Sequence, residues 1–390
     1  MSRQAPEYHA DIYADEGITD PYPHYQALRD LGGAVWLSAQ SVWAISRYDD
    51  VRNALRDHQG FSSASGVAIS ETVNRGLSGT TLASDPPLHD MLRKIISAPI
   101  TVGALNAMKP EISAAAHAVV DQLVHRRHFD AATDLAQHLP LTIVSQQVGL
   151  PEQGRENMLD YAAATFNMLG PENDRAVEGM PAVMQMRGYV ATLTRETVKP
   201  SSWAARLLDH VDQGTITAEQ YPILLRDYLG PSLDTTIFAT SSLISLFSKY
   251  PDQWDLLRSE PKLIRNAINE AIRLESPIRG FTRHLTADRE IEGVTLPAGS
   301  RALLLFASAN RDERKWVNPE RFDIRRKVID HLGFGFGIHS CAGVHLARLE
   351  IECLLEALVP LVRRFETGTP VRAMNNTLRG YASLPVTVHC

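Results

Sequence analysis

The chain has 390 residues, of which 44% are hydrophobic, and a formal net charge of −6 at pH 7. This composition suffices for a large core and lacks the basic signature of a nucleic-acid-binding protein, and no linker, repeat or charged block divides the chain, so we expect one domain over residues 1–390. Three cysteines imply no disulfide framework, and the N-terminus carries no apolar run for a signal peptide or membrane anchor, so a cytoplasmic protein is expected.

The first half of the chain is predicted to be mostly helical. Segment 20–31 predicts a helix, 34–37 and 42–45 a short hairpin, and 46–58 a further helix. Residues 59–84 are rich in Ser, Gly and Thr and predict a long loop of the kind that usually serves function. Apolar residues at helical spacing then predict helices over 87–99, 109–126, 134–149, 155–169, 176–197 and 203–212.

A long helix from about Ala218 to Lys249 is predicted next, and strand-like segments follow at 284–291, 295, 301–306 and 384–388. Helices first and small sheets last predict a mainly α fold of the α+β class. Within the long helix, Pro231 removes one N–H and the run of Asp234, Thr235 and Thr236 is a poor helix former, so we expect a bend. The bend opens a polar notch in which the Thr235 hydroxyl can bond the Pro231 carbonyl, a ligand or water. The alternative is that Asp234 caps the start of a separate helix.

The stretch from His331 to Gly343 carries the most chemistry. Its glycines at 333, 335 and 337 form a tight bend that lets a large flat group approach the backbone. Cys341 follows, at or just before a helix predicted over 344–362, where unpaired N–H groups favour a thiolate. This arrangement is typical of a soft metal ligand or a nucleophile. A buried free cysteine would leave the glycines unexplained, and a zinc site with His339 and His345 would lack paired-ligand spacing.

The order Phe334-Gly335-x-Gly337-x-His339-x-Cys341-x-Gly343 closely resembles the haem-binding loop of the cytochrome P-450 monooxygenases. The chain agrees with that family over almost its full length and is similar to the soluble bacterial members. The resemblance implies haem b as cofactor, with the Cys341 thiolate as the axial iron ligand and Phe334 and Gly335 against the haem, and O2 as co-substrate.

The same resemblance implies roles for residues outside the loop. Asp234 relays protons and Thr235 positions dioxygen and water, although Pro231 and Ser232 replace the small residues usual before this pair. Glu270 and Arg273 form a buried structural pair that locks the haem loop, with Arg321 as its third member. The haem propionates are expected to bind four cationic or donor side chains, namely His89, Arg93, Arg283 and His339.

Several framework stretches are closer to a bacterial subfamily that oxidises para-substituted benzoates. That subfamily holds the benzoate carboxylate with an Arg-x-x-Ser in the covering loop, matched here by Arg75 and Ser78, and with a second stretch in which Arg226 is kept while Asp227 and Gly230 replace serines. Because Asp227 would repel a carboxylate, either it pairs with Arg75 and the pocket takes a neutral phenol, or it points away. Further substrate contacts are expected from Arg279 as a cation and from the apolar residues Val67, Phe166, Leu169, Ile278 and Phe281.

The resemblance therefore predicts a haem-thiolate monooxygenase that hydroxylates or O-demethylates a small aromatic substrate. The chain shows no nucleotide-binding glycine fingerprint, so its electrons are expected from separate proteins. The resemblance implies that these are a [2Fe-2S] ferredoxin and an NAD(P)H-dependent ferredoxin reductase. These partners are expected to dock on the cysteine side through Arg93, Lys94 and Arg348. The alternatives are a terpenoid, fatty-acid or natural-product hydroxylase, a peroxide-driven peroxygenase and a haem-binding sensor.

Overall fold

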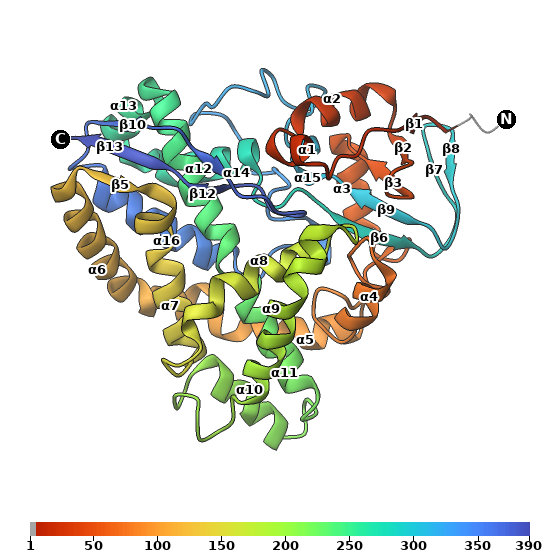
Figure 1. Cartoon of the computed structure of the whole chain (residues 1–390), viewed down its shortest axis with the longest axis horizontal. Helices are drawn as coiled ribbons and strands as arrows, with labels where there is room; N and C mark the ends of the chain where they lie inside the picture. Colours follow the sequence, from red (N-terminus) through yellow and green to blue (C-terminus); the bar gives the residue numbers. More distant parts are fainter. Residues whose placement is uncertain (1–4) are drawn as a thin grey trace.

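The computed structural model describes residues 5–390 and has a helical body flanked by small sheets (Figure 1). Its helices are α1 Asp15–Thr19, α2 Tyr22–Leu31, α3 Tyr48–Arg56, α4 Glu71–Leu77, α5 Leu88–Ser97, α6 Val102–Arg126, α7 His138–Val148, α8 Met158–Met168, α9 Asp174–Ala191, α10 Trp203–Asp212, α11 Gln220–Leu229, α12 Asp234–Lys249, α13 Pro251–Ser259, α14 Ile264–Glu275, α15 Phe306–Ala309 and α16 Val344–Leu358. A π-helical turn, Ala131–Ala136, precedes α7. The mainly α fold expected from the sequence is confirmed. One domain over 1–390 stays a prediction, and its first four residues lie outside the described part.

The larger sheet lies at one side of the helical body and the C-terminal sheet at the opposite side (Figure 1). The strands are β1 Glu7–Tyr8, β2 Ala34–Leu37, β3 Val42–Ile45, β4 Phe61–Ser62, β5 His128–Asp130, β6 Phe281–Leu285, β7 Arg289–Ile291, β8 Val294–Leu296, β9 Arg301–Leu304, β10 Arg364–Thr367, β11 Val371–Arg372, β12 Tyr381–Ser383 and β13 Pro385–His389. The larger sheet has the order β1-β2-β3-β9-β6-β4, and β10-β13-β5 form the C-terminal one. The predicted hairpin is confirmed, with Ala34 opposite Ile45.

The main hydrophobic core lies among the helices, and smaller clusters pack on the larger sheet. Helix α12 is buried along most of its length, and it packs against α14, α16 and the π-helical turn. Its apolar residues therefore stand at the centre of the molecule. Within residues 5–390, no helix is both long and apolar enough to cross a membrane.

Two predictions about local structure are wrong. The single helix expected over 218–249 is two helices, because the chain leaves helical hydrogen bonding at residues 230–233, where Pro231 lacks an N–H. The loop expected over 59–84 contains β4 and α4, whose first turn is capped by the Ser70 hydroxyl accepting the Val73 N–H at 3.3 Å. The shortness of α4 and the glycine inside it hid the helix from periodicity.

Candidate haem-thiolate site

The cysteine loop between α15 and α16 is the tight bend that its glycines predict. Gly335 and Gly337 have φ angles of 70° and 73°, a region that residues with a Cβ adopt only at a cost. A Cβ on Gly337 would also lie 2.5 Å from the Leu55 carbonyl oxygen. The Cys341 N–H donates to the Phe334 carbonyl at 2.8 Å, which closes the loop. Cys341 lies directly before α16 and faces an interior cavity.

The electrostatics of Cys341 combine opposing effects. The backbone N–H groups of Gly343 and Val344, together with Arg93 and Arg348, all favour its thiolate. Burial opposes them and is the larger effect, so the pKa of the thiol is raised above 9.0. The helix terminus alone therefore does not ionise this sulfur. A bound cation at the cavity would supply the missing stabilisation, which favours a metal ligand over a free nucleophile.

The cavity above Cys341 is formed by α5, the 77–82 segment, α8, the junction of α11 and α12, the segment after α14, β6 and the start of α16. Its lining includes apolar residues, cations, residues of the cysteine loop and one threonine that the sequence analysis singled out. These residues are Arg93, Phe166, Leu169, Arg226, Asp227, Gly230, Thr235, Ile278, Phe281, Arg283, Phe334, Gly335, His339 and Cys341.

His339 lines one end of this cavity, and His89 packs against it. The Nε2 atoms of His89 and His339 are buried and make no hydrogen bond among the described residues, and their rings lie 4.5 Å apart between centroids. Arg283 is buried, and the loss of solvent lowers its pKa to about 10. Two carboxylates lie near these histidines: Asp90 is 2.9 Å from His89 Nδ1, and Asp85 is 3.9 Å from His339 Nε2 and accepts from the Ser62 hydroxyl at 2.5 Å.

These features together fit a haem. Its iron needs a soft thiolate such as that of Cys341, and its flat ring needs a backbone free of side chains, as at Gly335. Its two propionates need donors at one edge, which the orphaned histidine nitrogens, Arg93 and Arg283 provide. No cluster of three or more metal-ligating side chains occurs in the described part of the chain. The zinc site considered above therefore lacks its ligands.

The junction between α11 and α12 forms the polar notch that the sequence predicts. Thr235 faces the cavity, and its hydroxyl donates to the Pro231 carbonyl at 2.9 Å. A separate helix does begin at Asp234, as the alternative interpretation predicts, but the Asp234 side chain makes no capping bond. Its carboxylate is 5% exposed and Oδ2 has no partner. Burial, and then the charge of Asp160, raises the pKa of Asp234 to about 7.

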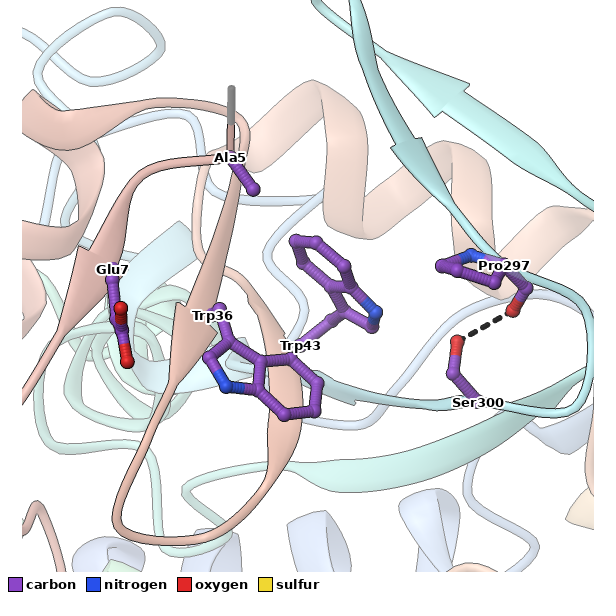
Figure 2. Close-up of a pocket in the computed structure, with 6 residues that line it drawn as sticks. All are labelled: Ala5, Glu7, Trp36, Trp43, Pro297 and Ser300. Carbon is purple, nitrogen blue, oxygen red and sulfur yellow. Dashed lines mark hydrogen bonds between the residues drawn. The ribbon is translucent and has the colours of Figure 1, made fainter. Parts of the chain in front are cut away.

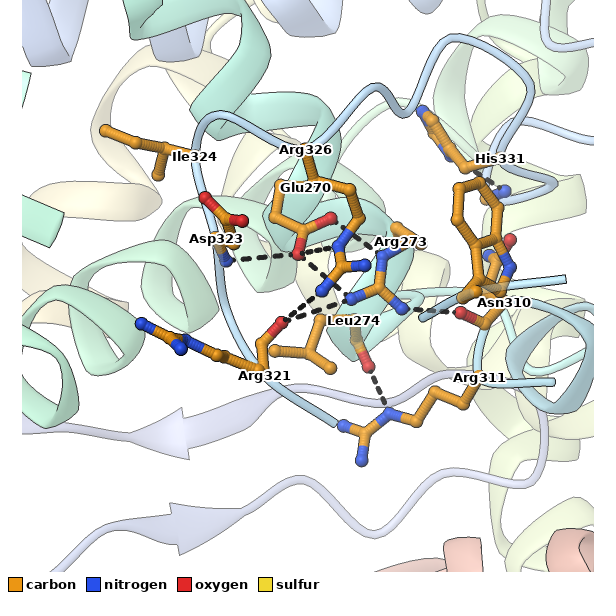
Figure 3. A network of polar contacts seen from close by, with 12 residues as sticks. Glu270, Arg273, Leu274, Asn310, Arg311, Arg321, Asp323, Ile324, Arg326 and His331 are labelled. Atoms are coloured by element: carbon orange, nitrogen blue, oxygen red, sulfur yellow. Dashed lines mark hydrogen bonds and ion pairs between the residues drawn. The ribbon is translucent and has the colours of Figure 1, made fainter. Parts of the chain in front are cut away.

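Glu270 and Arg273 of α14 form the buried pair that the family resemblance implies (Figure 3). Arg273 donates to both carboxylate oxygens of Glu270, at 2.7 and 3.0 Å, and neither side chain is exposed. The third member is Arg326, whose Nε lies 3.0 Å from Glu270 Oε1. Arg321 was expected there, but Figure 3 shows its side chain directed away, and it contributes only its backbone carbonyl. The prediction for Arg321 is therefore wrong.

The pair is connected to the cysteine loop through Asn310. Arg273 donates to the Asn310 carbonyl at 2.7 Å, and the Asn310 side chain accepts the Leu332 N–H at 2.7 Å. The same amide donates to the Ser276 hydroxyl at 2.9 Å, which ties it to the end of α14. The backbone entering the loop is thus held by buried, charge-assisted bonds.

Four predicted substrate contacts lie outside the cavity lining, so the structure does not bring them together with the other predicted contacts. Arg75 is exposed on α4 and donates to the Thr72 hydroxyl at 3.2 Å, and Ser78 is exposed as well. Val67 packs in the core. Arg279 is 3% exposed and donates to the Tyr25 hydroxyl at 2.9 Å and the Ile12 carbonyl at 2.8 Å, so it anchors the N-terminal segment.

The predicted docking residues are in three different environments. Arg93 lines the cavity, which leaves it directed inward rather than toward a partner. Arg348 donates to Asn269 at 3.0 Å and lies over the Phe334 ring at 4.9 Å. Lys94 is exposed.

Glu350 is a cavity residue that the sequence did not single out. It is 1% exposed, its Oε1 has no hydrogen-bond partner among the described residues, and burial raises its pKa to about 8. Its position on the same helix as the residues after Cys341, within an otherwise apolar stretch, was the available signal. A protonated acid at neutral pH therefore lines the cavity on α16.

A second concavity lies on the larger sheet, beside the first described residues (Figure 2). Trp36 and Trp43 meet edge to face there at 5.3 Å, and the Ser300 hydroxyl donates to the Pro297 carbonyl at 2.6 Å. Among the described residues, none of the lining side chains is a cysteine, histidine or cation, and Glu7 is the one ionisable group. The Cys341 cavity is therefore the candidate for chemistry.

Comparisons with known proteins agree with this geometry. The family model described as Cytochrome P-450 matches residues 192–385. Cytochrome P-450 CYP199A2 of Rhodopseudomonas palustris is 37% identical over 387 residues, covering 98% of this chain and 94% of the relative. The beta-dihydromenaquinone-9 omega-hydroxylase of Mycobacterium tuberculosis is 31% identical over 95% of this chain and 76% of its own length.

The fold has counterparts among solved structures. Cytochrome P-450 CYP109Q5 from Chondromyces apiculatus superposes with a TM-score of 0.84 at 26% identity, over 97% of this chain and 98% of the other. With the thiol, the cationic edge and the near full-length relatives in agreement, the chain belongs to the cytochrome P-450 family of monooxygenases, which bind haem through a cysteine thiolate and use O2.

Proposed function

We propose that this monooxygenase inserts one oxygen atom into a small aromatic substrate, by hydroxylating it or by removing an O-methyl group. The observation that supports this most directly is the shape of the cavity, in which Phe166, Leu169, Ile278 and Phe281 form apolar walls. Aromatic rings pack favourably against such walls and lose little conformational freedom on binding. The framework stretches that resemble the benzoate-oxidising subfamily support the same class.

The bound haem supplies oxygen activation, and the surrounding side chains hold it and control protons and water. Cys341 would bind the iron, while His89, His339, Arg93 and Arg283 would bind the propionates through the donors described above. The Glu270–Arg273–Arg326 network would keep the Cys341 backbone in place.

Asp234 and Thr235 would deliver protons. The Thr235 hydroxyl donates its hydrogen to the Pro231 carbonyl, so its oxygen remains free to accept a hydrogen bond from a water molecule in the cavity. With a pKa near neutrality, Asp234 can both take and release a proton at working pH. Since Asp234 is not part of the cavity lining, it would act from behind the notch. A peroxide-driven enzyme would not need this pair.

Electrons would come from a [2Fe-2S] ferredoxin and an NAD(P)H-dependent reductase. Among the residues expected to dock them, exposed Lys94 and half-buried Arg348 stay available on the cysteine side. A cytoplasmic location stays a prediction from the sequence.

A larger terpenoid or fatty-acid substrate is the second candidate, because one relative is named as a menaquinone hydroxylase. The test is a titration of the haem-loaded enzyme with para-substituted benzoates, methoxyphenols, terpenoids and fatty acids. We expect the low- to high-spin shift of the Soret band with the aromatic compounds, followed by formaldehyde release from methoxy substrates when NADH and redox partners are added. A shift with terpenoids or fatty acids and none with any aromatic compound would reject the proposal.

A further inference from the structure

The polar end of the Cys341 cavity lies where the segment of residues 77–82 meets α11. Asp227 and Thr81 both line the cavity there, and the Thr81 N–H donates to Asp227 Oδ2 at 3.0 Å. This bond holds one carboxylate oxygen in place and joins residues far apart in the sequence. The side chain of Asp227 is thereby oriented by the backbone of the segment that covers the pocket.

Two polar atoms at this end are left for a ligand. Thr81 is 4% exposed, and its buried Oγ1 has no hydrogen-bond partner among residues 5–390. Asp227 Oδ1 likewise accepts no hydrogen bond from the described residues. An unpaired buried hydroxyl costs free energy, which a bound group of matching chemistry would recover. Asp227 Oδ1 can only accept a hydrogen bond, whereas the Thr81 hydroxyl can donate one.

The charges around this end do not favour an anion. Arg75 and Arg279, the cations expected to hold a carboxylate, are bonded elsewhere. Arg226 lines the cavity. The negative charge of Asp227 stabilises the Arg226 cation, whereas the positive charge of Arg187 destabilises it. Arg226 and Arg187 place positive charge near Asp227, but a carboxylate in direct contact with the Asp227 carboxylate would still be repelled by it.

Asp227 is ionised at working pH. Its folded environment raises its pKa to about 6, mainly through burial, with Thr81 and Arg226 acting in the opposite direction. At about pH 8 the carboxylate is therefore an acceptor and carries its negative charge. A benzoate anion would bind beside this second negative charge, or Asp227 would first have to take up a proton from solvent.

We propose that Asp227 and Thr81 form a substrate-recognition pair that selects a neutral aromatic hydroxyl, as in a para-substituted phenol, over a benzoate of the same shape. The phenol O–H donates to Asp227 Oδ1, and its oxygen accepts from Thr81 Oγ1–H. A benzoate can only accept hydrogen bonds, so it can pair with the Thr81 hydroxyl but leaves Asp227 Oδ1 without a donor. This inference rests on the proposed function and narrows its substrate class.

The test compares 4-methoxyphenol with 4-methoxybenzoate, which share the ring and the methyl ether. Dissociation constants come from Soret titrations of the haem-loaded enzyme at about pH 8. We expect the phenol to bind the wild type at least about tenfold more tightly, which is the size of one charge-assisted hydrogen bond. Asp227→Asn keeps the shape and removes the charge, and it should cut this preference about tenfold, chiefly by improving benzoate binding.

Two further variants separate recognition from folding. Thr81→Val keeps the volume and should weaken phenol binding about tenfold, whereas Arg75→Ala, outside the cavity, should change neither ligand. The absorption spectrum of each reduced, carbon monoxide-bound variant shows whether its haem site is intact.

The outcomes distinguish the inference from the proposed function. Benzoate binding as tightly as the phenol to the wild type, or an unchanged preference in Asp227→Asn, would overturn the recognition pair while the aromatic function stands. A spin shift with neither compound nor with any other aromatic would overturn both.

Discussion

Replacing Asp234 by asparagine should change how the stability of the enzyme depends on pH. The pKa of Asp234 is raised from 3.8 to about 7, because the carboxylate is buried without a partner. A carboxyl group whose pKa is raised on folding contributes stability that is complete below the unfolded pKa and is lost as the pH rises through the folded one. For this group the window is therefore between about pH 4 and pH 7.

The expected magnitude follows from the two pKa values. Between about pH 5.5 and pH 8.5, the wild type should lose about 2 kcal/mol of unfolding free energy through Asp234 alone. Asp234→Asn cannot titrate, so it should lack this loss, whatever the amide itself costs in unmet hydrogen bonds. The variant should also turn over slowly with redox partners, because an amide cannot relay a proton.

Urea unfolding of the haem-loaded protein, followed by circular dichroism at the two pH values, measures the difference. The matched control is Asp121→Asn on α6, an exposed carboxylate with no ion pair in the described structure. It should keep the wild-type pH dependence. If Asp234→Asn and the wild type lose the same stability between the two pH values, Asp234 is already ionised below pH 5.5 and the reasoning fails.

Three further predictions concern residues around the haem. Arg326→Ala should cost about 2–4 kcal/mol of unfolding free energy, because it leaves part of the buried Glu270 charge unpaired, whereas Arg321→Ala should stay within about 0.5 kcal/mol; equal losses in urea unfolding would contradict the network. Glu350→Gln should remove an infrared band of a protonated carboxyl at about pH 7 and change stability by less than about 1 kcal/mol; a wild type without that band would show an ionised Glu350. Arg283→Gln should speed haem transfer to apomyoglobin about tenfold, since it removes a charge-assisted bond, with Lys94→Gln as the unaffected control; wild-type haem retention in Arg283→Gln would remove its propionate role.

The parts of the site that the sequence predicts well are those encoded within a few consecutive residues. The cysteine loop depends on glycines at alternate positions, and the Glu270–Arg273 pair depends on helical spacing, so both are confirmed by the geometry. The break before α12 follows equally from Pro231, although the sequence led us to expect a bend in one helix.

The errors concern side chains whose direction depends on distant packing. Arg321 and Arg326 lie on the same irregular segment, and only the path of that segment decides which guanidinium reaches Glu270. Arg75 lies in a matching motif but faces solvent, and Arg279 is captured by Tyr25. Local spacing cannot encode such competition among partners.

The break between α11 and α12 has a consequence for how this enzyme can diverge. Asp227, on α11, lines the cavity, whereas Asp234 and Thr235 begin α12. The two helices share no continuous backbone hydrogen bonding across residues 230–233. Under the proposed function, a substitution that shifts α11 would therefore change which ring substituent is accepted without displacing Asp234 and Thr235. Selection, in nature or in the laboratory, can act on substrate choice and on oxygen chemistry as separate traits of one chain.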